Sequence, residues 1–141
     1  NQPPHRMHGQ LDNAYSSKKN KIKVREPIII NKLDAKKRNI KNDDIVLVYN
    51  HRGRVLAGAR LSDDVMKGVV VLSVGAWFDP DYNLNIDRHG NPNTLTKDVG
   101  TSSLSQAPTS HTTLVDIRKA KKDDISEVKI FKMPDIVNKN T

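Results

Sequence analysis

Short apolar runs separated by polar clusters make up most of this chain. Runs this short, and rich in valine and isoleucine, favour strands over helices. One of them alternates, so that Val55, Ala57, Ala59 and Leu61 share a face, as in a strand with one buried side. The pattern predicts strands at residues 27–30, 45–49, 54–61, 69–72 and 112–117, with a weaker candidate at 125–131.

A single short helix is expected between the first two strands. Asn31 is a favourable N-cap residue, and residues 32–38 follow it before the chain turns at Asn39. His51–Gly53 predicts a tight hairpin after the second long strand. Several short strands joined by turns, with little helix, predict a mainly β protein in the form of a β-barrel.

Three parts are expected along the 141 residues. Residues 1–24 lack apolar periodicity and predict an extended, flexible arm that contributes to a ligand site. Residues 25–119 hold the predicted strands and form the barrel. Residues 120–141 are expected to be a partly disordered tail, frayed over 134–141.

Composition limits the chemistry. Apolar residues make up 35% of the chain, with one tryptophan, three tyrosines and two phenylalanines, so the core is expected to be small and aliphatic. The sequence contains no cysteine, which excludes disulfides, thiolate metal sites and cysteine nucleophiles within it. No apolar run approaches the roughly 20 residues of a membrane helix. The first residue is Asn1 rather than Met, and we expect the chain to be a piece of a longer protein.

The net charge of +8 leaves two interpretations open. Lysine and arginine cluster at turn positions beside Asn and Asp, as on an ordinary solvated surface. The same charge would also attract an anionic cofactor or partner. Nucleic acid is the less favoured partner, because few aromatic residues are present to stack on bases.

Residues 89–106 form the longest stretch without apolar periodicity. They combine glycine, proline, asparagine, threonine and serine with one carboxylate, Asp98. Such a segment buries little surface by itself, so it is either disordered or shaped around a ligand. Its amide, hydroxyl and backbone N–H groups suit a flat, polar, phosphorylated molecule.

Several motifs together resemble the molybdopterin-dinucleotide-binding domain that closes the C-terminus of bis-molybdopterin oxidoreductases. Residues 35–46, AKKRNIKNDDIV, are similar to the family's A-x-x-x-G-I-x-D-G-D-x-V. Residues 5–13, HRMHGQLDN, resemble H-R-x-H-S-Q-L-D-N. Further matches at 50–55, 68–70, 75–80, 90–96 and 98–102 follow in the family's order, so that the resemblance covers about residues 4–119.

Three departures from the family pattern affect expectations. Asn39 and the pair Asn42-Asp43 replace glycine-bearing turn positions, and we expect the turns to survive because Asn tolerates left-handed backbone better than most residues. Gly9 stands where the family has serine, which removes one hydroxyl from the expected cofactor contacts.

The resemblance implies a double-psi β-barrel and a bis(molybdopterin guanine dinucleotide) cofactor with molybdenum in the full-length parent. The loop motifs resemble the branch that reduces N-oxides and S-oxides: trimethylamine N-oxide, dimethyl sulfoxide or biotin sulfoxide. The partners implied are the parent's remaining domains, one of which supplies a serine ligand to the metal. The fragment alone is expected to be inactive. The electron donor, the choice between molybdenum and tungsten, and the compartment (bacterial periplasm or cytoplasm) stay open.

The cofactor-contacting residues expected from motif and chemistry are Arg6, His8, Gln10, Asn91, Asn93, Asp98, Thr101, Ser102 and Gln106. Amides such as Gln10 and Asn93 carry a donor and an acceptor that match pterin or purine edges. Other roles are open: Asn93 as a turn residue and Asp98 as a cap of the turn at Gly100. No residue is expected to be catalytic or to bind metal.

Two other functions are weighed against this one. The first is a free-standing molybdopterin-binding subunit of the formylmethanofuran dehydrogenase type. The second is a basic β-barrel that binds nucleic acid, which a steep salt dependence of binding would reveal.

Overall fold

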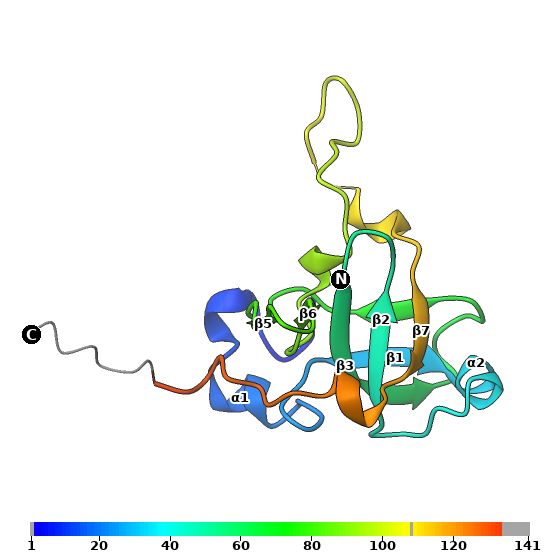
Figure 1. The fold of residues 1–141 in the computed structure, drawn as a ribbon. Helices are drawn as coiled ribbons and strands as arrows, with labels where there is room; N and C mark the ends of the chain where they lie inside the picture. The colour runs from blue at the N-terminus through cyan, green and yellow to red at the C-terminus, as the bar shows by residue number, and fades with distance from the viewer. Residues whose placement is uncertain (1, 108, 134–141) are drawn as a thin grey trace, which may run out of the picture.

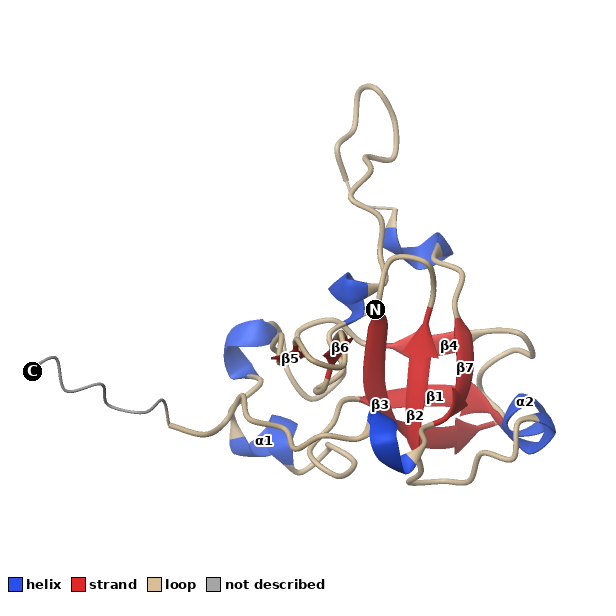
Figure 2. Ribbon diagram, viewed as in Figure 1, coloured by secondary structure: helices blue, strands red, loops and turns tan. Residues whose placement is uncertain are grey.

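Seven strands form one mixed sheet in the computed structural model, which describes residues 2–107 and 109–133 (Figures 1 and 2). The main path of the sheet runs β4-β1-β3-β2-β7, and the small strands β5 and β6 attach to β3. The strands are β1 (Pro27–Asn31), β2 (Ile45–Tyr49), β3 (Arg54–Ser62), β4 (Val70–Leu72), β5 (Pro80–Asp81), β6 (Ile86–Asp87) and β7 (Asp116–Lys119).

The prediction of a mainly β protein with short helices is confirmed. The helix is α2 (Lys32–Lys37), and the Asn31 side chain caps it by accepting a hydrogen bond from the Leu33 N–H at 2.9 Å. β1 and β3 run parallel, whereas β2 forms antiparallel pairs with both β3 and β7. Among the described residues the strands make an open path that ends at β4 and β7.

The strand predicted at 112–117 is partly wrong, and the one predicted at 125–131 is entirely wrong. The last strand lies at 116–119 rather than 112–117, since residues 110–112 form the 3-10 turn η3 (Ser110–Thr112) and the pairing of Ile117 with Val48 sets the register. Residues 125–131 form no strand. β5 and β6 were not predicted, because two-residue strands are too short to show a period.

The main core lies on one face of the sheet. Val55, Ala57 and Ala59 of β3 are fully buried there, as their alternation predicts, and Leu61 packs at its margin. The core also contains Ile28, Ile30, Ala35, Ile40, Val46, Val48, Leu95 and Ile117. A smaller cluster on the other face is formed by Leu47, Leu56 and Ile86.

The arm is not extended, which corrects the prediction for its conformation. It contains the 3-10 turn η1 (Gly9–Leu11) and the helix α1 (Tyr15–Lys18), and it packs against the sheet. Ile22 fits onto Gly58 so closely that a Cβ atom added to Gly58 would lie 2.3 Å from the Ile22 Cβ. Buried polar side chains supply much of the remaining contact between the arm and the rest of the molecule. For this reason the pattern of apolar residues did not show that the arm is packed.

The turns at the substituted glycine positions form as expected. Asn39 has φ of 53° and Asp43 has φ of 64°, both in the left-handed region that glycine normally fills. The predicted β-barrel domain at 25–119 and the boundaries on either side stay predictions. The predicted frayed end, 134–141, lies outside the described residues.

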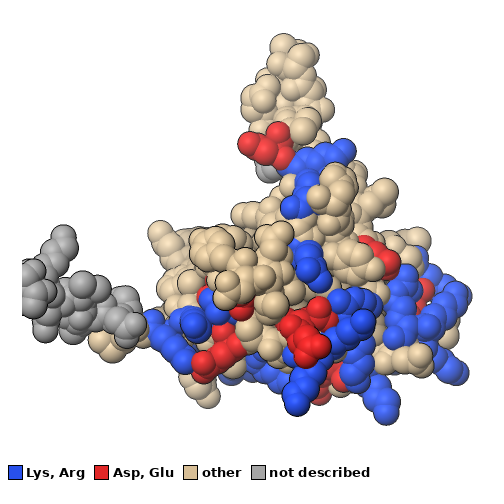
Figure 3. Space-filling model, in the orientation of Figure 1, with Lys and Arg blue, Asp and Glu red and all other residues tan. Residues whose placement is uncertain are grey.

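Charge is unevenly spread over the surface. Lys and Arg side chains gather on the part of the molecule that holds α2 and the neighbouring strand ends (Figure 3).

None of the helices in the described residues is both long and apolar enough to cross a membrane. Nor do three His, Asp or Glu side chains gather there in a way that would hold a metal ion.

Candidate functional site

A short turn of the arm, η1, is held tightly against the loop that precedes β5. The indole N–H of Trp77 donates a hydrogen bond to the carbonyl of Gly9, and the Trp77 backbone N–H donates to the Asp12 carboxylate at 3.0 Å. A Cβ atom added to Gly9 would lie 3.3 Å from the carbonyl oxygen of Gly75. The two backbones therefore approach closely, and the turn is fixed in place.

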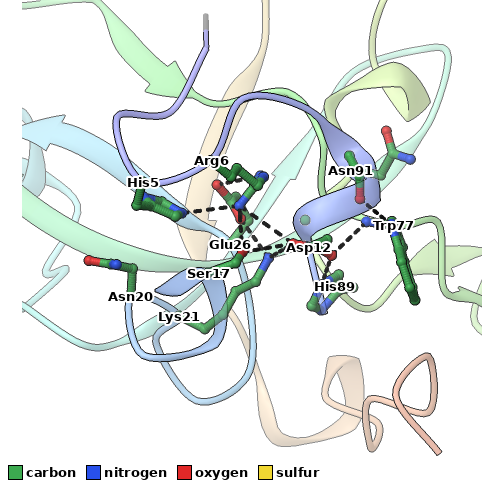
Figure 4. Close-up of polar contacts among 12 residues, drawn as sticks. His5, Arg6, Asp12, Ser17, Asn20, Lys21, Glu26, Trp77, His89 and Asn91 are labelled. Carbon is green, nitrogen blue, oxygen red and sulfur yellow. Dashed lines mark hydrogen bonds and ion pairs between the residues drawn. The ribbon is translucent and has the colours of Figure 1, made fainter. Parts of the chain in front are cut away.

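A buried ion network lies behind this turn (Figure 4). The Nε2 atom of His89 lies 2.8 Å from one oxygen of Asp12, and Lys21 Nζ lies 2.5 Å from the other. Lys21 also contacts Glu26 at 2.7 Å. All four side chains are almost completely buried, so each charge depends on its partners in the network.

Arg6, a predicted cofactor contact, belongs to the same network. Its guanidinium donates to the Ser17 hydroxyl at 3.0 Å, to Glu26 at 3.1 Å and to the carbonyl of Val74 at 2.9 Å. The side chain is fully buried. Arg6 thus ties the arm to Glu26, directly before β1, and to the segment after β4. Its contact with a cofactor stays a prediction.

The network holds Asp12 in its ionised form. Burial alone would raise the pKa of this carboxyl. Hydrogen bonds from His89, Lys21 and the Trp77 backbone N–H outweigh burial and lower the pKa of Asp12 well below its ordinary value. The carboxylate is therefore the charged centre around which the arm folds.

A second buried carboxylate, Asp87, shapes the segment that follows β6. It accepts hydrogen bonds from the backbone N–H groups of Asp79, Gly90 and Asn91, at 2.7–2.8 Å. Burial nevertheless raises the pKa of Asp87 above its ordinary value. Because His89 lies between these anchored residues and pairs with Asp12, the network joins the η1 turn to the segment that begins at Asn91.

Four predicted residues lie on the two turns that the network joins. His8 and Gln10, at η1, are exposed. The Asn91 side chain caps the 3-10 turn η2 (Pro92–Thr94) by accepting a hydrogen bond from the Asn93 N–H at 2.9 Å. Asn93 is itself exposed. Three of the four, all but Asn91, present their side chains to solvent.

Asn93 also lines a groove of about 340 Å³. One part of its wall is apolar and comes from Val71, Leu72 and Val74, at and after β4. The other part is polar and includes Asn93, Thr96, Ser110 and His111. A flat heterocycle with polar edges suits such a groove, because it can pack on the apolar wall and bond to the polar one.

The other four predicted residues lie on a projecting loop, which we call the finger (residues 97–107 and 109). Figure 1 shows it extending away from the sheet at the top of the molecule. Thr101 and Ser102 bond within the finger, to the backbone at Ser105 and Leu104, and the Gln106 side chain lies against Gly100. Asp98 is exposed at its base. The structure does not bring these residues together with those at η1 and η2.

Sequence reasoning missed the residues that hold the two turns in register. In the sequence, Lys21, Glu26 and His89 look like ordinary exposed polar residues. Asp12 lies inside the motif at residues 5–13, and His89 lies directly before the motif at residues 90–96. These positions were the only sign in the sequence that the two residues have a special role. Trp77 anchors the loop before β5 through its bonds to Gly9 and Asp12, whereas its neighbour Phe78 is 52% exposed.

The fold and the site define a small, mainly β ligand-binding domain with exposed amide and imidazole groups beside a groove. The chain belongs to the Molydopterin dinucleotide binding domain family, whose model it matches over residues 1–114. The resemblance identified from the motifs is thereby confirmed.

The similar curated proteins include trimethylamine-N-oxide reductases. The chain is 46% identical to that of Salmonella typhimurium over an alignment of 121 positions, which covers 83% of this chain and 14% of the relative. It is 43% identical to trimethylamine-N-oxide reductase 1 of Escherichia coli O157:H7 over 136 residues, 94% of this chain and 16% of the relative. The chain therefore spans about a seventh of the length of these relatives.

The family confirms the cofactor prediction, a molybdopterin guanine dinucleotide with molybdenum. The residues present fit such a group: His8, Gln10 and Asn93 offer exposed donors and acceptors, and the groove beside Asn93 has an apolar wall. Such a group would supply redox chemistry at its metal. The residues of this chain would bind it and orient its pterin and guanine edges.

Proposed function

We propose that this chain is the cofactor-binding part of a larger reductase that removes an oxygen atom from an N-oxide, with trimethylamine N-oxide as the favoured substrate. The observation that carries this proposal is the 43–46% identity to trimethylamine-N-oxide reductases over most of the chain. The S-oxides, dimethyl sulfoxide and biotin sulfoxide, are alternative substrates.

The proposal includes finer points of fold and assembly. The domain adopts the double-psi form of the β-barrel and covers one side of a bis(molybdopterin guanine dinucleotide) cofactor, and the remaining domains of the parent cover the rest. His8, Gln10, Asn91 and Asn93 contact the cofactor from the two joined turns. Asp98, Thr101, Ser102 and Gln106 reach it from the finger once the remaining domains are in place, and Arg6 supports the arm. The parent resides in the bacterial periplasm or cytoplasm.

The test compares the activity of the full-length parent with that of this chain alone. The parent is expected to reduce trimethylamine N-oxide with a reduced dye as electron donor, and with a higher kcat/KM than for either S-oxide. The 141-residue chain alone is expected to show no turnover, because the metal ligand and the substrate pocket lie outside it. Preference for an S-oxide would reassign the substrate, and turnover by the chain alone would contradict the proposal.

Site variants of the parent test the cofactor contacts separately. Asn93→Ala combined with Asp98→Ala removes two polar groups expected to bond the cofactor, and we expect molybdenum and pterin content to fall about tenfold, as for the loss of 1–2 hydrogen bonds to a buried ligand. Asn83→Ala, at an exposed turn between β5 and β6, is the matched control. Unchanged metal-pterin content in the double variant would refute the assignment of both residues.

A further inference from the structure

The segment after β7 crosses back over the arm and the loops that hold the site. It begins with the 3-10 turn η4 (Lys122–Asp124), where Arg118 of β7 binds Asp124 through two contacts, at 2.7 and 3.0 Å. Arg25 then donates to the carbonyl of Ser126 at 2.6 Å, and the Lys129 N–H donates to the Asp79 carboxylate at 2.8 Å. Residues 124–131, which we call the strap, are thus fixed at three places.

The strap ends on Phe131, whose ring packs between three parts of the molecule. The His89 ring meets it edge-on, with centroids 4.9 Å apart, and the Trp77 ring lies 5.9 Å away. Lys18 of α1 places its ammonium 4.8 Å from the centre of the Phe131 ring. These contacts are of the aromatic and cation–π kinds that stabilise beyond simple burial.

The side chains that Phe131 contacts are the ones that hold the η1 turn. The Trp77 indole N–H donates to the Gly9 carbonyl, the Trp77 backbone N–H donates to Asp12, and the His89 ring pairs with Asp12. The Nδ1 atom of His89 is buried and has no hydrogen-bond partner among the described residues. Its ring orientation therefore depends on the Asp12 contact at one end and on packing against Phe131.

We propose that Phe131 is a positioning residue that keeps the turn carrying His8 and Gln10 in register with the turn carrying Asn91 and Asn93. It does so through Trp77 and His89, without touching the cofactor. That these two turns contact a cofactor rests on the proposed function. The role of Phe131 in holding the two turns together does not depend on it. Phe131 lies beyond residue 114, where the match to the family model ends.

The first test uses the ligand-free 141-residue chain and its single tryptophan, Trp77. Phe131→Ala is expected to increase acrylamide quenching of Trp77 and to speed hydrogen exchange of the Trp77 amide and the arm amides about tenfold. Exchange of the β2 amides Val46 and Val48 is expected to stay unchanged. Phe131→Tyr keeps the ring and is expected to restore the values of the unmodified chain.

Met133→Ala is the matched control, because Met133 lies in the same segment and is 88% exposed. The proposal is overturned if Phe131→Ala behaves like Met133→Ala. It is also overturned if the β2 amides exchange faster by the same factor, since Phe131 would then only add global stability.

The second test measures metal-pterin content in the parent. Phe131→Ala is expected to lower it about tenfold, and Phe131→Tyr to restore it. If Asn93→Ala with Asp98→Ala lowers the content but Phe131→Ala does not, the positioning role is wrong and the proposed function stands. If the content falls with Phe131→Ala alone, the positioning role stands and the two contacts are wrong.

Discussion

At the scale of single residues, Val24 is the one β-branched residue with a positive φ among the described residues. It has φ of 68° and follows Lys23, which has φ of 48°, in the tight turn that pairs Ile22 with Arg25. Positive φ at both central positions defines a turn that normally carries Asn-Gly. A β-branched residue is poorly suited to this conformation, because its Cβ substituents crowd the backbone.

Val24→Gly is therefore expected to stabilise the chain by about 1 kcal/mol, because a left-handed residue other than glycine costs about 1–2 kcal/mol and glycine costs some entropy in the unfolded state. Val24 is 51% exposed, so little packing is lost. Urea unfolding measures the change.

Asn39→Gly supplies the comparison for this prediction. Asn tolerates left-handed backbone, so its gain is expected to be smaller than that of Val24→Gly. A loss of stability in Val24→Gly, or a larger gain in Asn39→Gly, would show that backbone strain is not what limits these turns.

At the scale of elements, the junction between β1 and α2 depends on one side chain. Asn31 accepts from the Leu33 N–H and donates to the carbonyl of Val65 at 2.7 Å. It therefore caps the helix and also ties it to the turn that leads to β4. The cap was readable from the sequence, whereas the second bond depends on a residue 34 positions away.

Asn31→Ala is expected to lower the free energy of unfolding by about 1–2 kcal/mol, because it removes the cap and leaves the Val65 carbonyl without its donor. Thermal or urea unfolding measures the loss. Asn31→Asp keeps the cap acceptor but cannot donate to Val65, and an intermediate loss is expected. An Asn31→Ala variant as stable as the unmodified chain would rule out both contributions.

The element predictions succeeded where a face of a strand or helix is apolar. β1, β2 and β3 were located closely because their valine and isoleucine residues are buried in the main core. The arm and the strap were misjudged because each is held by ion pairs, backbone hydrogen bonds and one aromatic ring. Such contacts join residues far apart in the sequence and leave no periodic pattern.

At the scale of the whole molecule, the buried network makes folding sensitive to acid. The pKa of Asp12 is lowered in the folded state. Its ionised form therefore contributes stability that is fully present above the ordinary aspartate pKa of 3.8, and this contribution is lost as the pH falls toward the lowered value. Asp87 acts in the opposite direction, because burial raises its pKa.

Asp12→Asn is expected to cost about 3 kcal/mol at pH 7, because it leaves the buried Lys21 without one of its charged partners. The difference from the unmodified chain is expected to shrink below pH 3.8, where the unmodified chain also loses the contribution of the carboxylate. Urea unfolding at a series of pH values measures both effects.

Asp63→Asn is the control for the acid prediction. It breaks an exposed ion pair with Lys32 and is expected to cost less than about 1 kcal/mol at any pH. A cost for Asp12→Asn that does not vary with pH would show that the network contributes through shape rather than charge.

The sequence by itself determined β1, β2 and β3, the capped helix, the left-handed turns at Asn39 and Asp43, and the family. Each of these depends on local backbone chemistry or on the order of short motifs, which a linear sequence records. The tertiary structure alone decided that Arg6 and His89 belong to a buried network, that the finger stands apart from the η1 and η2 turns, and that Phe131 closes over the arm. Those outcomes depend on which distant charges and rings share a low-dielectric interior, and that information exists only once the chain has folded.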